Sequence, residues 1–204
     1  MTTRRYEQKA RAAAADETRR RILDAVRDKL REAPSEPVSI EKVAQEAGVA
    51  RSTVYLVFGS RAGVFEALGR DLLDRAGFVR IVEAVALPDA REALRASFRA
   101  SAEVYAAERD VGRALSSMTR LNPEAVGGAF DVVDHGRIEG LRHLATRLKQ
   151  QGYLRPDVSV AEATDILWLI TGFDAFDELH TTRGLTPAQV AKRLTAIAER
   201  TLLV

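Results

Sequence analysis

Four neighbouring side chains in the first third of the chain carry the chemical groups that contact nucleic acid. Arg51, Ser52, Thr53 and Tyr55 fall within a single short segment. Serine and threonine hydroxyls reach phosphate oxygens or base edges, a threonine methyl contacts a thymine methyl, and arginine binds phosphate or guanine. The cluster therefore predicts a surface that contacts double-stranded DNA.

A second group of side chains has the spacing of a metal site. His135, Glu139 and His143 recur every four residues, with Asp131 one turn earlier, and histidine and carboxylate at this spacing can share a metal ion. Helical periodicity argues against such a site, because the apolar residues of the segment define a buried face nearly opposite His135 and Glu139. We expect a solvated face, no metal and, without a convergent polar set elsewhere, no enzyme.

The residues around the first cluster have the pattern of a helix-turn-helix. Ser39 is a good N-cap for a helix that Gly48 ends, and a short second helix is expected at about 51–57. Small or branched apolar residues stand where the two helices must lock together: Val43, Ala44, Ala47, Val49 and Val54. The polar cluster then faces outward from the helix that enters the major groove, and the motif is predicted at 39–58.

This part of the chain resembles the DNA-binding domain of TetR-type transcriptional regulators. The resemblance covers residues 17–70 and rests on three features: Gly48-Val49, Tyr55-x-x-Phe58 and Ser60-Arg61 before Phe65. It implies DNA contacts for Thr18, Ser39, Arg51, Ser52, Thr53, Tyr55, Leu56 and Arg61. Leu56 departs from the family pattern, since many relatives have a polar or basic residue there. Two alternatives stay open: Ser39 caps a helix with or without DNA, and Tyr55 can be a core residue.

The first third of the chain is also basic. Residues 1–61 contain 13 lysines and arginines against 9 acidic residues, a net of +4, whereas residues 62–204 contain 18 against 20, a net of −2. Such an asymmetry is typical of a polyanion-binding end attached to a neutral body. Residues 1–16 are predicted as a mobile arm whose cations either grasp DNA or are simply solvated: Arg4, Arg5, Lys9 and Arg11.

The remainder predicts helices only. The composition is rich in strong helix formers, and no segment alternates with the period of a strand. N-caps are expected at Asp89, Asn122, Ser159 and Thr186, the third opening one continuous helix at 160–179. We expect an all-α fold of about nine helices, with a three-helix DNA-binding domain at 17–70 and a helical domain at 71–204. The absence of cysteine and of long apolar runs favours a cytoplasmic protein with no membrane partner.

The resemblance implies that the C-terminal domain dimerises and binds a small ligand. The helices at 160–179 and 187–201 are apolar enough to form a four-helix interface, or to complete the core of one subunit. The expected interface residues are Trp168, Ile170, Leu194, Ile197 and Thr201. The candidate pocket residues, each of which is also a candidate for plain core, are Phe98, Tyr105, Leu115, Met118, Phe130, Leu141, Trp168 and Phe173.

These patterns together predict a sequence-specific DNA-binding regulator without a cofactor. The specific hypothesis is a homodimeric repressor that binds a palindromic operator and is released by a small apolar or amphipathic effector through a population shift. The alternative is a DNA-binding regulator or architectural protein with no small-molecule effector.

Overall fold

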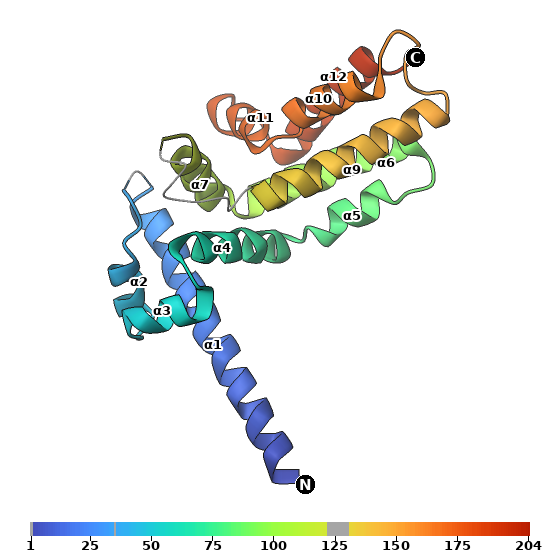
Figure 1. Cartoon of the computed structure of the whole chain (residues 1–204). Coiled ribbons are helices and arrows are strands. Elements are labelled where there is room, and N and C mark those ends of the chain that lie inside the picture. Colours follow the sequence, from blue (N-terminus) through green and yellow to red (C-terminus); the bar gives the residue numbers. More distant parts are fainter. Residues whose placement is uncertain (1, 35, 122–130) are drawn as a thin grey trace.

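The computed structural model of the chain describes residues 2–34, 36–121 and 131–204 (Figure 1). Within these residues the chain forms eleven α-helices and one π-helical turn, and the β-type pairing is limited to a bridge between Leu154 and Leu203. The predicted all-α fold is confirmed, with somewhat more helices than the nine expected.

The first four helices contain the predicted DNA-binding motif: α1 (Thr2–Glu32), α2 (Ile40–Glu46), α3 (Arg51–Phe58) and α4 (Arg61–Ala76). The remaining elements are α5 (Val79–Val85), α6 (Ala90–Ala107), α7 (Arg109–Leu121), α9 (Asp131–Gln150), α10 (Val160–Ile170), α11 (Phe173–Asp177), the π-helix η2 (Glu178–Thr182) and α12 (Pro187–Leu202). Predicted N-caps are observed, with side chains accepting from backbone N–H groups, at Ser39, Asp89, Ser159 and Thr186. Ser60 caps α4 in the same way. The expected cap at Asn122 lies outside the described residues.

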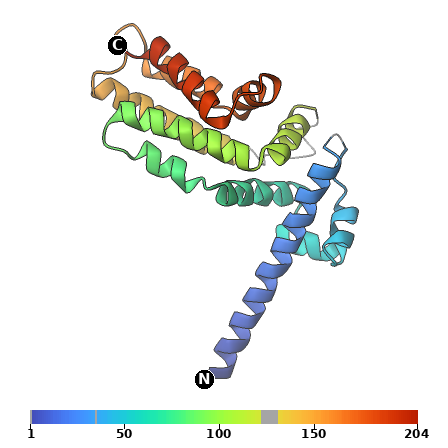
Figure 2. The same ribbon diagram turned by 180° about the vertical axis from the view of Figure 1, so that it is seen from behind.

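The N-terminal arm differs from the prediction of a mobile segment. Residues 2–16 continue the first helix without a break, because the alanines at 12–15 have the highest helix propensity and carry the helix across the expected boundary. The N-terminal half of α1 projects away from the rest of the molecule in both views (Figures 1 and 2). Lys9 and Arg11 are exposed there, whereas the side chains of Arg4 and Arg5 lie outside the described residues.

Two further elements correct the sequence prediction. The helix expected at 160–179 is interrupted at Thr171 and Gly172, and Gly172 takes an extended conformation before α11. Glycine weakens a helix interior because its backbone loses more entropy on ordering. The short helix α5, which has no side-chain cap at Phe78, was not predicted.

The buried apolar residues form two separate hydrophobic cores. The N-terminal core joins α1–α4 to α7, whose Val111, Ala114, Leu115 and Met118 pack with it. The C-terminal core joins α6, α9, α10 and α12, with Phe176 of α11 also buried in it. Helix α7 therefore packs with the helix-turn-helix, although it follows α6 in the chain.

A buried arginine, Arg27, links the helices of the N-terminal core to the corner between α6 and α7. Only 4% of Arg27 is exposed, and its guanidinium donates to Asp24 at 2.7 Å and to Asp71 of α4. Its Nε lies 4.0 Å from a carboxylate oxygen of Glu108, at the corner between α6 and α7. Arg31 donates to the same carboxylate at 2.9 Å. The guanidinium of Arg27 thus connects α1, α4 and the α6–α7 corner.

We expect Arg27→Leu to lower the free energy of unfolding by about 2–4 kcal/mol, because the mostly buried carboxylates of Asp71 and Glu108 lose their buried cation and keep only Arg75 and Arg31, which are more exposed. Urea denaturation measures this change. The matched control is Arg20→Leu on the same helix, whose pair with Glu17 is solvent-exposed and should contribute less than about 1 kcal/mol. Equal losses in both variants would contradict a special role for Arg27.

Candidate DNA-binding surface

A tight turn brings α2 and α3 into close contact. Gly48 has a φ of +65°, in the left-handed region that glycine adopts without steric cost. The Val49 N–H donates to the carbonyl oxygen of Ala44 at 2.9 Å and closes the turn. Val43 and Val54 are fully buried within the N-terminal core. These contacts fix the direction in which α3 leaves the domain.

The connection from α3 to α4 is equally close. A Cβ atom added at Gly63 would lie 2.1 Å from the carbonyl oxygen of Phe58, so the first turn of α4 requires glycine there. Arg61 donates to the carbonyl oxygen of Val38 at 2.7 Å and lies over the ring of Phe65. Arg61, which is predicted to contact DNA, therefore also holds α4 against the segment before α2.

The outward face of α3 carries most of the predicted DNA-contacting side chains. Arg51, Ser52 and Leu56 are exposed, and Thr53 is half-buried. Tyr55 is half-buried and packs against the N-terminal core, so its ring belongs largely to the protein interior. The Arg51 guanidinium lies 5.6 Å from the centre of the Tyr55 ring and 3.6 Å from a carboxylate oxygen of Glu41.

The two remaining predicted DNA contacts, Thr18 and Ser39, already have hydrogen-bond partners within the chain. Thr18 donates from its hydroxyl to the carbonyl oxygen of Ala14 at 2.9 Å. The hydroxyl of Ser39 accepts from the N–H of Lys42 at 3.4 Å. A further cation was missed from the sequence: Arg19 lies over the ring of Phe58, 4.8 Å from its centre. The run of three arginines that precedes Ile22 in α1 is the sequence feature that could have indicated a cation at this position.

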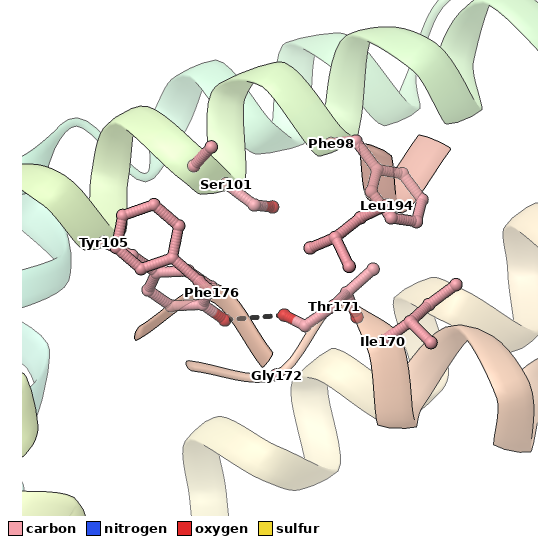
Figure 3. A pocket seen from close by; sticks show the side chains of 9 residues that line it. Phe98, Ser101, Tyr105, Ile170, Thr171, Gly172, Phe176 and Leu194 are labelled. Carbon is pink, nitrogen blue, oxygen red and sulfur yellow. Dashed lines mark hydrogen bonds between the residues drawn. The ribbon is translucent and has the colours of Figure 1, made fainter. Parts of the chain in front are cut away.

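A small cavity lies between α6, α12 and the break after α10 (Figure 3). The hydroxyl of Tyr105 donates to the carbonyl oxygen of Thr171 at 3.0 Å, and burial raises the pKa of Tyr105, so this hydroxyl remains a neutral donor. The cavity volume is about 10 Å³, which is room for about one water molecule. Its lining is Phe98, Ser101, Ala102, Tyr105, Ile170, Thr171, Gly172, Phe176 and Leu194.

The predicted pocket residues are dispersed. Phe98 and Tyr105 line the cavity, and Phe173 packs edge-on against Tyr105 at 5.5 Å between ring centres. Leu115 and Met118 lie in the N-terminal core instead. Leu141 packs on the C-terminal core and Trp168 is exposed, and neither lines the cavity. Phe130 lies outside the described residues. The sequence missed Thr171, Gly172 and Phe176 because it predicted an unbroken helix there.

The described residues contain no cluster of three or more metal-ligating side chains. Two of the residues with metal-site spacing in the sequence, Glu139 and His143, are exposed. Glu139 accepts a hydrogen bond from Arg142 at 2.5 Å. The side chain of His135 lies outside the described residues. Among the helices that the structure describes, none is both long and apolar enough to cross a membrane.

A helix-turn-helix on a base formed by α1 and α4, joined to a larger helical body, is the arrangement typical of DNA-binding transcriptional regulators. Residues 22–68 match the family model described as "Bacterial regulatory proteins, tetR family". This part of the chain is thus a TetR-type DNA-binding domain, and the predicted resemblance is confirmed.

Two solved structures that are similar to most of the chain are described as a repressor and a regulator. NalD, the secondary repressor of the MexAB-OprM multidrug efflux pump in Pseudomonas aeruginosa, is 22% identical, with 94% of this chain and 98% of that chain covered and a TM-score of 0.73. The fatty acid degradation regulator FadR from Bacillus halodurans is 18% identical, with 88% and 96% covered and a TM-score of 0.72. At these identities the likeness establishes the fold. No curated protein sequence matches the chain significantly.

We expect Gly63→Ala to destabilise the protein by about 2 kcal/mol or more, since its Cβ would meet the backbone of Phe58. The same substitution at Gly140, where nothing lies within 4 Å of the added Cβ, should stabilise α9 by roughly 0.5–1 kcal/mol. Thermal unfolding followed by circular dichroism measures both. A stable Gly63→Ala variant would mean that α4 does not approach α3 this closely.

Proposed function

We propose that the chain is a sequence-specific repressor that binds palindromic operator DNA as a homodimer and responds to a small ligand. The observation that carries the proposal is the rigid presentation of α3. Its inner face is buried in the N-terminal core through Val54, while Arg51, Ser52 and Leu56 point to solvent. A short, exposed helix held on a packed base is what major-groove recognition requires.

Cations beside α3 would supply the sequence-independent part of binding. Arg61 stands at the amino end of α4, where free N–H groups and the helix dipole favour phosphate. Thr18 and Ser39 would add hydroxyl contacts to phosphate. The basic N-terminal half of α1, with exposed Lys9 and Arg11, would lie against DNA outside the groove, and its contribution should fall as salt rises.

A negative charge on the outer face of α3 tests this proposal. Ser52→Glu should weaken binding to an operator selected from random DNA by at least about tenfold, because the carboxylate faces phosphates and base acceptors. Ser117→Glu places the same charge at an exposed position of α7 and should leave affinity within about twofold. Fluorescence anisotropy with excess random DNA measures both. Unchanged binding by Ser52→Glu would exclude α3 as the recognition helix.

The homodimer would form through α10 and α12, which pack against each other. Each exposes large apolar side chains: Leu169 is 67% exposed and Ile197 46% exposed, and Trp168 is exposed beside Leu169. Thr201 is exposed one turn after Ile197. Leu194 is buried in the C-terminal core and Ile170 is half-buried beside the cavity, so these two predicted interface residues would contribute less. Burial of exposed apolar side chains is the main drive for such association.

Ile197→Glu should therefore produce monomers and weaken operator binding, because the glutamate would be desolvated in an apolar interface. Sedimentation velocity measures the oligomeric state. Val82→Glu is the matched control, since Val82 on α5 is 54% exposed and lies outside α10 and α12; it should leave the dimer intact. A dimeric Ile197→Glu variant would place the interface on another surface.

The ligand would enter beside Tyr105, where an apolar lining carries the hydroxyls of Ser101 and Tyr105. A ligand larger than water must open this cavity and displace α11. Helix α11 is tied to α7, because Arg113 donates to Asp177 at 2.8 Å and Ser116 donates to Asp174 at 2.9 Å. Since α7 packs in the N-terminal core, a shift of α11 would reach α1 and favour a conformation that does not bind DNA.

The alternative is a DNA-binding regulator without a small-molecule effector. The size of the cavity favours it, since about 10 Å³ leaves no space for an organic molecule without rearrangement. Release of the operator by any small apolar or amphipathic compound would support the ligand-responsive form, provided that the compound also raises the melting temperature of the free protein.

A further inference from the structure

We propose that Leu56 contacts the 5-methyl group of a thymine in the major groove, so that each half-site carries one thymine that the protein selects through this methyl. The inference rests on the proposed function, because it needs α3 to lie in the groove. It adds the residue that determines specificity and the chemical group that it recognises.

The position of Leu56 is the first observation. Its side chain is 86% exposed, the highest value among the large hydrophobic residues that the structure describes. It lies three and four positions after Thr53 and Ser52, so the three share one face of α3. The other apolar residues of α3 either are buried, as Val54 is, or pack against the N-terminal core, as Val57 and Phe58 do. Leu56 does not take part in that packing.

The chemistry of the neighbours is the second observation. Arg51, although exposed, lies near the Tyr55 ring and 3.6 Å from a carboxylate oxygen of Glu41, and Thr53 is half-buried. Ser52 and Leu56 are thus the side chains of α3 that extend outward without such contacts. A serine hydroxyl both donates and accepts, so it tolerates several bases. Leucine has no hydrogen-bonding group, and the apolar feature that base pairs present in the major groove is the thymine methyl.

The physical consequence is a selectivity that depends on one methyl group. Covering Leu56 removes its apolar surface from water, and the gain is kept only if the opposing surface is apolar too, because desolvation of an unpaired polar edge costs free energy. Against a thymine the methyl provides that surface, whereas a cytosine or guanine presents polar edges. The remaining polar contacts of α3 would set the position of the helix, and Leu56 would discriminate at that base pair.

The experiment begins with selection of bound sites from random DNA by the full-length protein. Each thymine of one selected half-site is then replaced by uracil, which keeps the base pairing and lacks only the methyl group. Wild-type affinity should fall about fourfold at one position, the factor expected for burial of a single methyl. Leu56→Ala should bind the thymine site more weakly and show no loss on the same uracil substitution. Leu87→Ala, an exposed leucine outside α3, should respond as the wild type does.

The outcomes separate the two proposals. If a defined site is selected but uracil weakens binding equally in wild type and Leu56→Ala, or weakens it at no position, the Leu56 contact is wrong and DNA recognition by α3 stands. If no sequence is enriched, the proposed function fails and the Leu56 contact fails with it. Because Leu56 is exposed, the melting temperature of Leu56→Ala should equal that of the wild type, which excludes unfolding as the cause of any loss.

Discussion

The buried guanidinium of Arg27 is the constraint on which the arrangement of the molecule depends. A charge in this position is stable only if carboxylates and hydrogen bonds surround it, and the carboxylates come from three places: Asp24 in α1, Asp71 in α4 and Glu108 at the end of α6. Any movement of α6 against α1 changes the surroundings of this cation. The helix-turn-helix is therefore connected to the C-terminal helices by a charge cluster that tolerates few geometries.

Helix α7 adds an apolar connection to this ionic one. Its buried face belongs to the N-terminal core, and its polar face is joined to α11 by Arg113 and Ser116. Gly112 is the point of closest approach, because a Cβ there would lie 2.8 Å from the ring of Phe173. The same helix thus contacts both the DNA-binding end and the edge of the cavity. In the proposed ligand-responsive form, a displacement at the cavity would reach α1 through this packing, and the ligand itself would not need to contact α1.

The sequence predicted the helix-turn-helix well because local signals determine it. Ser39, Gly48 and Ser60 act within a few residues of their own positions, as caps and as a left-handed turn. The sequence does not indicate which residues line the C-terminal cavity, since they come from α6, from α12 and from a helix break, and no local pattern brings them together. Leu115 shows what helical periodicity cannot predict. Its position in the apolar pattern of the helix correctly indicates a core residue, but the pattern does not say which of the two cores it belongs to.

The helix break after α10 places the cavity beside the end of the proposed interface helix. An uninterrupted helix would use the carbonyl oxygen of Thr171 within its own backbone, whereas here that oxygen accepts from the buried hydroxyl of Tyr105. The break also ends the helix whose exposed Leu169 would face a second subunit. A ligand that displaced Tyr105 would have to disturb the end of the interface helix and the start of α11 together. The cavity, the proposed interface helix and the start of α11 therefore meet at Thr171 and Gly172. A conformational change that began at this short irregular segment would affect both the contact with the partner subunit and, through α11 and α7, the DNA-binding end.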